Sequence, residues 1–514
     1  MFKNEKTVIG EISFGGFGNA TVVDSSGEFT YPIYIKKNKT NRALHLDIVK
    51  VKILNNSDSK PSGEVIEIVE RFKTEFVGKI QLSDKFAFFI PDNKKFFVDF
   101  FVPLNELKGA KDNDKVIIKL KSWSRNKKNP NGSVVKILGK SGDNDVEIHS
   151  ILEDYNLPYD FPKKVINESN GITNGATIDE ISKRLDLRGV LTFTIDGETA
   201  KDLDDALSIK WVGENVEIGV HIADVSHYVK PNSKIDGEAY KRGTSVYLVD
   251  RVIPMLPEKL SNDLCSLNPN TDKLVYSFIF TFNKSGKIIN KDFKRGVINS
   301  NYRLTYTEVQ KIIDGSEGRN YELKEAVLCL DKYAKILRKS RGDKQSLRLN
   351  GSEVRFRFDE NGIPTSVYHV EQSDSNWLIE EFMVLTNREV CEFVTKKSVP
   401  TLHRTHDTPD LLKLESLKTF VESIGYKLDI SDNDKIKENL NNLIKSSLDT
   451  SEENIINNLV VRCMSKANYQ TTNIGHYGLG VSHYMHTTSP IRRYPDLIFH
   501  RILSSVLPNN GYLK

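Results

Sequence analysis

The chain has 514 residues, of which 38% are hydrophobic and 28% are charged, a composition typical of folded proteins and unlike that of a disordered chain. This length predicts two to four domains, and the net charge of +4 is too small to indicate a nucleic-acid partner by itself. No run of about 18 apolar residues and no secretory signal is visible, and the four cysteines are scattered without a CxxC pair. These features argue against a membrane span, a zinc site and a disulfide framework, and we expect a cytoplasmic protein.

The first part of the chain consists of short alternating apolar runs separated by Gly, Ser and Asn turns, a pattern typical of β-strands. Two successive blocks of about five such runs predict two small β-barrels. The fold class that we expect is a multidomain α+β chain with mixed strands and helices after the barrels. The expected boundaries are 1–57 for barrel 1, 58–140 for barrel 2, 141–187 for a connecting segment and 188–514 for the mixed domain.

The stretch "TIDGETAKDLDDALSI" at 194–209 gathers carboxylates among apolar residues. We expect a buried strand that ends at Asp196, a turn at Gly197 and a second strand that starts after a loop. Such a junction would bring together Asp196, Asp202, Asp204 and Asp205, and carboxylate oxygens are ligands that suit Mg²⁺ or Mn²⁺. A solvated acidic turn or a calcium loop is the structural alternative, although the EF-hand pattern is absent.

Two other stretches carry polar or aromatic groups that could contact a phosphate or a nucleobase. In "HTTSPIRRYPD" at 486–496, Arg492 and Arg493 follow a Ser-Pro that could begin a helix, and such a pair can grip a phosphate. A buried Arg–Asp ion pair explains the pattern equally well. Tyr247 lies in an apolar strand, where a core tyrosine and a base-stacking residue are both compatible with the local sequence.

Five stretches occur in an order that resembles the RNB catalytic domain of the ribonuclease II and ribonuclease R family. They are "TIDGETAKDLDDALSI", "HIADVSHYVKP", "RGTSVYLVDRVIPMLPEKLSNDLCSLNP", "LIEEFMVLTN" and "HTTSPIRRYPDLIFHR". In that family two cold-shock domains of the OB type precede the nuclease, which agrees with the two expected barrels. The family domain continues and an S1 domain follows it, so we expect this chain to lack both the end of the RNB domain and the S1 domain.

The resemblance implies a processive 3′→5′ exoribonuclease that hydrolyses single-stranded RNA to nucleoside 5′-monophosphates with Mg²⁺, for which Mn²⁺ could substitute. It places catalytic and metal-binding roles on Asp196, Asp202, Asp204 and Asp205, and a catalytic phosphate contact on Arg492. It places RNA contacts on Tyr247, Tyr306 and one of Glu380 and Glu381; the sequence does not choose between the two glutamates. We also expect the neighbouring Arg493 to contact RNA.

The barrels could guide the same single strand, because OB-type barrels stack bases on exposed aromatic rings. Phe14 and Phe17 are candidates since their flanking glycines permit close approach, although many barrel phenylalanines must fill the cores. We expect a monomer that binds single-stranded RNA and no membrane. The alternatives are a weakly active or inactive RNB-type RNA-binding regulator and a cold-shock-like RNA chaperone.

Overall fold

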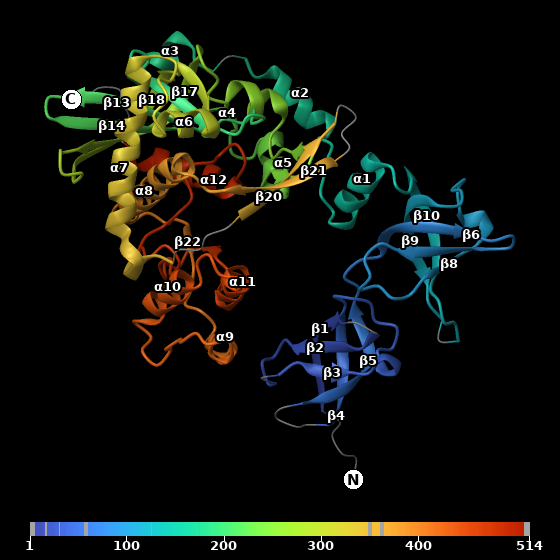
Figure 1. The fold of residues 1–514 in the computed structure, drawn as a ribbon. Coiled ribbons are helices and arrows are strands. Elements are labelled where there is room, and N and C mark those ends of the chain that lie inside the picture. Colours follow the sequence, from blue (N-terminus) through green and yellow to red (C-terminus); the bar gives the residue numbers. More distant parts are fainter. Residues whose placement is uncertain are drawn as a thin grey trace. The chain divides into compact units, whose positions relative to one another are not determined.

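The structure is a computed structural model that describes residues 6–15, 18–29, 31–55, 60–124, 126–173, 175–347, 352–359 and 364–507. The chain divides into two compact units, residues 1–159 and residues 160–514, and each is described by itself (Figure 1). Among the described residues, no helix is both long and apolar enough to cross a membrane.

The first barrel closes in the strand order β1-β2-β3-β5-β4. Its strands are β1 (Thr7–Phe14), β2 (Ala20–Asp24), β3 (Ile33–Ile35), β4 (Ile48–Asn55) and β5 (Ser62–Glu70). Alternate residues of β1 are buried, as a period of two on a half-buried strand requires, and they pack with Val22 and Ile33 inside the barrel. The fold class expected from the sequence, two OB-type barrels before a mixed domain, is confirmed.

The expected boundary between the barrels at residue 57 is wrong, because β5 pairs with β4 and with β3 and so closes the first barrel. The polar stretch before Ser62 has the composition of a linker, yet it connects two neighbouring strands of one barrel. The second barrel closes in the order β10-β8-β7-β6-β9. Its strands are β6 (Glu75–Leu82), β7 (Ala87–Pro91), β8 (Phe100–Val102), β9 (Asp114–Ser122) and β10 (Asn131–Lys140), and α1 (Asn144–Asp154) follows them.

The second unit is built on a seven-stranded sheet of order β11-β18-β17-β14-β13-β12-β19. The strands are β11 (Leu185–Asp186), β12 (Thr192–Asp196), β13 (Asp205–Val212), β14 (Asn215–Ala223), β17 (Asp272–Phe282), β18 (Ile288–Asn299) and β19 (Tyr302–Thr305). Its central strands are antiparallel, whereas the two edge pairs, β11 with β18 and β12 with β19, are parallel. As expected, β12 is a buried strand that ends at Asp196.

The second unit also contains helices and three two-stranded sheets (Figure 1). The helices are α2 (Lys163–Gly171), α3 (Ile178–Ser182), α4 (Val225–Tyr228), α5 (Lys234–Arg242), α6 (Tyr306–Ile313), α7 (Tyr321–Gln345), α8 (Asp374–Lys396), α9 (Leu411–Ser423), α10 (Ile436–Ser446), α11 (Glu453–Cys463) and α12 (Tyr494–Val506). The small sheets pair β15 (Val246–Tyr247) with β16 (Val252–Ile253), β20 (Ser352–Phe358) with β21 (Pro364–Glu371), and β22 (His403–Thr405) with the distant β23 (Asn468–Gln470).

Three apolar clusters hold these elements together. The largest joins the sheet to α6, α7, α8 and α12 through residues such as Phe278, Leu330 and Phe382. A second cluster joins the sheet to α2, α4 and α5, and it includes Leu203 and Ile491 from the two motif-bearing loops. Helices α9, α10 and α11 pack around their own cluster, which includes Leu417. The two loops that carry the sequence motifs are therefore anchored in one core.

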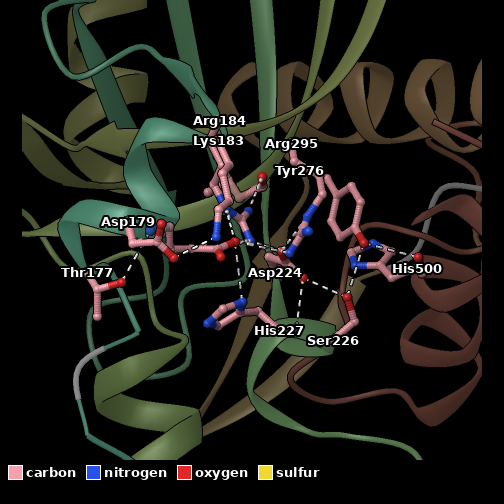
Figure 2. Close-up of polar contacts among 12 residues, drawn as sticks. Thr177, Asp179, Lys183, Arg184, Asp224, Ser226, His227, Tyr276, Arg295 and His500 are labelled. Atoms are coloured by element: carbon pink, nitrogen blue, oxygen red, sulfur yellow. Dashed lines mark hydrogen bonds and ion pairs between the residues drawn. The ribbon is translucent and has the colours of Figure 1, made fainter. Parts of the chain in front are cut away.

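A buried ionic network joins the sheet to helix α12 (Figure 2). The carboxylate of Asp224, which directly follows β14, is fully buried and accepts hydrogen bonds from Arg184 Nη2 at 2.7 Å and Arg295 Nη2 at 2.9 Å. Although burial alone would raise it, the two guanidinium groups hold the pKa of Asp224 below its ordinary value. Ser226 links this carboxylate to the Tyr276 hydroxyl, which donates to the His500 carbonyl of α12 at 3.1 Å.

We expect Asp224→Asn to lower the free energy of unfolding of the second unit by about 3 kcal/mol, because it leaves the buried Arg184 guanidinium and the partly exposed Arg295 guanidinium opposite a neutral amide. Asp179→Asn is the matched control: Asp179 pairs with Lys183 on the exposed surface of α3, and its loss should cost less than about 1 kcal/mol. Because the pKa of Asp224 is lowered in the folded protein, its contribution to stability is fully present above pH 3.8 and is lost as the pH falls below that value. Urea titrations at several pH values measure both variants; equal losses would contradict the prediction.

Candidate active site

The four aspartates lie around the loop that connects β12 to β13. Asp196 ends β12 and Asp205 begins β13, and Asp202 and Asp204 occupy the end of the loop between them. The two strands pair as antiparallel neighbours only through Thr192 and Phe193. Beyond that point β12 continues beside β19, so the strands separate and the loop opens at the end of the sheet.

Asp204 joins this loop to the residues that precede α12. Its side chain is only 2% exposed; Oδ1 accepts a hydrogen bond from the Ile491 N–H at 2.8 Å, and Oδ2 accepts one from Arg492 Nε at 3.2 Å. Arg492 Nη2 also donates to Ser489 Oγ at 3.0 Å. Two motifs almost 290 residues apart in the chain thus share one carboxylate. Burial raises the pKa of Asp204 to about 7 despite the charge of Arg492.

The positive groups around Asp196 and Asp205 do not fully offset the cost of burying these two carboxylates. Burial raises the pKa of Asp196 to about 6, and the charge of Asp202 adds to the shift. Burial also raises the pKa of Asp205 well above its ordinary value, and the charges of Asp196 and Asp204 raise it further. Oδ2 of Asp196 is buried and lacks a hydrogen bond of good geometry among the described residues, although the nearby Thr194 hydroxyl, itself buried without a partner, acts to lower the pKa of this carboxyl. A bound cation would reduce the repulsion among these carboxylates and would pair with the buried oxygen.

These side chains do not form a finished metal site. Within the described ranges, no three His, Cys, Asp or Glu side chains are gathered closely enough to hold an ion. The aspartates are nevertheless near enough to raise one another's pKa, and they offer hard oxygen donors. The unpaired oxygen of Asp196 and the mutual repulsion fit the binding of Mg²⁺, which is usually held by few carboxylates together with substrate phosphates.

Tyr247 lies beside the carboxylates and keeps its ring accessible. Its hydroxyl donates a hydrogen bond to Asp202 Oδ2 at 2.6 Å, and the residue is 51% exposed. Burial of the hydroxyl end, together with this bond, raises the pKa of Tyr247. A ring that is fixed at one end and open to solvent can stack on a base. The geometry therefore favours a base-stacking role for Tyr247 over that of a core tyrosine.

Tyr306 is the first residue of α6, directly after β19. A capping box between Thr305 and Glu308 fixes the start of this helix. Burial raises the pKa of Tyr306, and the nearby charges of Asp205 and Asp196 raise it further. The hydroxyl of Tyr306 therefore lies within electrostatic reach of the aspartates.

The two candidate glutamates on α8 differ in their surroundings. Glu381 is 3% exposed, and both of its carboxylate oxygens accept from the Arg341 guanidinium, with a bond from Nε at 3.1 Å. The side chain of Glu380 is 46% exposed and lies 3.8 Å from Arg341. Glu381 thus serves an internal ion pair, and Glu380 has the more accessible carboxylate.

The remaining candidates divide between the active site and the barrels. Arg493 donates to Asp496 at 2.8 Å, while its Nε is buried without a partner in the described parts of the chain.

Phe14 is 6% exposed in the core of the first barrel, and its ring packs against Phe97 at 5.0 Å between centroids. A base cannot stack on such a buried ring, so the geometry speaks against an RNA contact there. Phe17 lies outside the described residues.

Two supporting residues escaped the sequence reading. Arg303 Nη2 donates to the carbonyls of Glu198 and Ala200 at 3.0 and 2.6 Å and so braces the aspartate loop. Asn387 on α8 is buried, and its Oδ1 accepts from the N–H and the hydroxyl of Thr487 in the segment that leads to Arg492. Neither residue belongs to a motif, and the local sequence does not predict a contact between residues about 100 positions apart.

Comparison with known protein families identifies the two parts of this architecture. The RNB domain family matches residues 184–509, and a cold-shock domain family matches residues 88–162. The second match covers most of the second barrel together with α1. The RNB match contains all four aspartates and both arginines of the site.

Individual relatives agree with this assignment. Ribonuclease R of Thermotoga maritima is 38% identical over 99% of this chain and 72% of its own length. The structure of Mycoplasma genitalium ribonuclease R in complex with ribose-methylated single-stranded RNA matches with a TM-score of 0.90 at 27% identity, over 97% of this chain and 79% of that one. Yeast Ssd1, described as a pseudonuclease, shares the fold at 21% identity with a TM-score of 0.73, over 99% of this chain and 70% of its own. The chain belongs to the ribonuclease R family of RNB-domain proteins.

Proposed function

We propose that this chain is a metal-dependent 3′→5′ exoribonuclease that hydrolyses single-stranded RNA processively to nucleoside 5′-monophosphates. The family supplies the general activity, and the observation that carries the proposal is the contact between Asp204 and Arg492 beside the mutually repelling Asp196 and Asp205. In the reaction, water adds to the scissile phosphorus and the bond from phosphorus to O3′ breaks. The shortened strand keeps a 3′-hydroxyl, and the released nucleotide keeps the phosphate.

The aspartates would hold Mg²⁺, or Mn²⁺ in its place. Asp196 is the strongest candidate ligand, because its Oδ2 is buried without a partner among the described residues. Asp202, Asp204 and Asp205 border the same loop and contribute hard oxygen donors. When bound, the ion supplies activation of water and neutralisation of phosphate charge.

Arg492 would contact the scissile phosphate. Its Nε and Nη2 are occupied by Asp204 and Ser489, whereas Nη1 has no hydrogen bond to any described residue. The side chain is 44% exposed, and the negative charge of Asp204 raises its pKa against the effect of burial. A guanidinium that is fixed on one side and open on the other is well placed to stabilise charge that develops on a phosphate.

Three other residues would position the end of the strand. The half-exposed Tyr247 ring would stack on a base without reading its identity, which suits degradation of any sequence. Tyr306 and the more accessible Glu380 would contact the terminal ribose. The bond between Tyr247 and Asp202 ties this clamp to the metal ligands.

The barrels would guide the incoming strand. On the second barrel, Phe86, Phe88 and Phe101 are each partly exposed, and their rings lie 5.4 to 6.3 Å apart. Rings in such a cluster can stack on bases, unlike the buried Phe14. A role restricted to RNA binding would need only this part of the chain. The presence of all four aspartates and Arg492 favours hydrolysis over that alternative.

Asp204→Asn separates hydrolysis from binding. The substitution is nearly isosteric and keeps an oxygen for the Ile491 N–H, but it removes a charge that we assign to metal binding. We expect cleavage to fall by orders of magnitude, while RNA affinity persists or increases because phosphates meet less repulsion. Shortening of a 5′-labelled strand measures cleavage, and fluorescence anisotropy measures binding. Near-normal rates at saturating Mg²⁺, with Asp179→Asn as the control, would contradict the assignment.

Arg492→Lys tests the contact with the phosphate. Lysine keeps the positive charge but loses the planar set of donors that Asp204 and Ser489 orient. We expect kcat to fall roughly 10²-fold or more with a modest change in RNA affinity. Single-turnover cleavage and equilibrium binding measure the two quantities. Equal losses in both would indicate that Arg492 serves only as a structural partner of Asp204.

The raised pKa values predict how metal binding depends on pH. Protons compete with the ion for Asp196 and Asp204, whose pKa values are raised to about 6 and about 7. We expect the affinity for Mn²⁺, measured by calorimetry without RNA, to weaken as the pH falls from 8 to 6. In the metal-free protein the sign is opposite: a raised pKa favours the protonated folded state, so thermal stability should fall as the pH rises through 7. Flat Mn²⁺ affinity over this range would exclude the two carboxylates as ligands.

A further inference from the structure

Arg404 is a cation for which the described residues supply no acidic partner. It lies in β22 opposite Tyr469 of β23, and its guanidinium carbon stands 4.6 Å from the centre of the Tyr469 ring. Its backbone N–H donates to the Tyr484 carbonyl, which fixes β22 beside the segment that leads to Arg492. Across the described residues, no ion pair or hydrogen bond joins the Arg404 guanidinium to a carboxylate, although the residue is partly buried. The Arg404 guanidinium, held near the Tyr469 ring, could therefore bind an anionic ligand.

Tyr469 and His486, the polar groups beside Arg404, carry no negative charge, and the Asp496 carboxylate that acts on Tyr469 is paired with Arg493. The Tyr469 hydroxyl and His486 Nδ1 lie 2.6 Å apart in a hydrogen bond, and the His486 ring packs edge-on against Tyr484. Burial, together with the charges of Arg493 and Arg404, lowers the pKa of His486 to about 2. The imidazole is therefore neutral and can exchange hydrogen bonds without contributing charge.

The charge of Arg493 acts on the same tyrosine and histidine as that of Arg404. Arg493 Nη2 is paired with Asp496, but its Nε is buried and has no partner among the described residues. Its charge acts on His486 and Tyr469, and also on Asp204 and Asp205. Arg493 thus connects the surroundings of Arg404 with the aspartate loop.

We propose that Arg404 and Arg493, with the hydrogen-bonded Tyr469 and His486, form a second phosphate subsite next to Arg492. The inference rests on the proposed exoribonuclease function and adds a contact to it. Two guanidinium groups with unused N–H donors and one paired carboxylate leave a local excess of positive charge. Arginine forks and neutral hydroxyl or imidazole donors are the groups that proteins use to hold phosphate oxygens.

The chemistry of the reaction indicates which phosphate the subsite takes. An enzyme that removes one nucleotide from a 3′-hydroxyl end cuts the last linkage, so no phosphate lies beyond the scissile one. Every neighbouring phosphate belongs to the strand that remains. The subsite therefore holds the phosphate next to the scissile one, on the retained strand, and would keep the RNA bound while the mononucleotide leaves.

The test combines a substitution with an RNA that lacks one charge. The parent is the full chain with Asp204→Asn, which should bind RNA without cutting it. Single-stranded RNA labelled at its 5′ end carries a neutral methylphosphonate at the scissile linkage, at the next one or at the one after it. Fluorescence anisotropy then measures the affinity of the parent and of the parent with Arg404→Gln for each RNA and for unmodified RNA.

We expect the methylphosphonate next to the scissile linkage to weaken binding by the parent roughly tenfold or more. Arg404→Gln should weaken binding of unmodified RNA to a similar extent, and the same methylphosphonate should then cause little further loss. The slope of log affinity against log salt should shrink by about 0.7, the value for one phosphate contact on a single strand. Arg404→Lys should recover part of the affinity because it restores the charge alone.

The matched control is Arg319→Gln. Arg319 also lies near an aromatic ring, that of Tyr302 at 6.0 Å, but it is paired with Glu308 at 2.8 Å. Its substitution should leave affinity, salt dependence and the response to methylphosphonate unchanged. This comparison separates a specific phosphate contact from the general loss of one positive charge.

Additive losses from Arg404→Gln and the methylphosphonate would overturn the proposal, as would a loss no larger than that of Arg319→Gln. A response spread equally over the three linkages would indicate a general electrostatic field and would also overturn it. If Arg404→Gln fails to fold, Arg404→Lys and the affinities of the parent for the three methylphosphonate RNAs decide. A parent whose affinity does not change when the linkage next to the scissile one is neutral has no such subsite. Absence of RNA binding by the parent would instead refute the proposed function itself.

Discussion

The arrangement of the candidate active site depends on one buried carboxylate. Asp204 accepts from the Ile491 N–H and from Arg492, and so joins the loop after β12 to the residues that begin α12. Because its burial favours the protonated form, the carboxylate remains charged only where the arginine and a cation compensate for it. The same contact thus fixes where Arg492 stands and, under the proposed function, how strongly the site would attract a metal ion. A change at either partner alters both properties.

The sheet supports this contact through its ends. The Ala223 N–H donates to the Asp204 carbonyl, and the next residue is Asp224, whose buried ion pairs hold Arg184 and Arg295 together. Through Tyr276 the network also reaches His500 on α12, the helix that follows Arg492. The two motifs therefore meet twice, once at Asp204 and once through the Asp224 network. Such double attachment limits relative motion of the carboxylates and the arginine, which pre-organises the site for a transition state.

The sequence predicted the parts of the site whose signal is local. Alternation predicted the barrels, and the position of Asp196 at a strand end placed the carboxylates at one edge of the sheet. The boundary near residue 57 failed because the loop before β5 has the composition of a linker, and only strand pairing shows that it is internal. Neighbouring residues on a helix such as Glu380 and Glu381 cannot be distinguished without the partner Arg341. Phe14 looked accessible beside its glycines, but it completes the barrel core.

The site places repulsive and attractive groups for the same substrate side by side. Under the proposed function, the four aspartates would repel RNA phosphates until a cation binds, whereas Arg492, Arg493 and Arg404 would attract them. Binding of the strand and binding of the metal would then be coupled, since a phosphate brings charge that the arginines accept and oxygens that an ion requires. Burial raises the pKa values of Asp196 and Asp204, so a bound cation would favour their charged forms. Metal and RNA would therefore each strengthen the binding of the other.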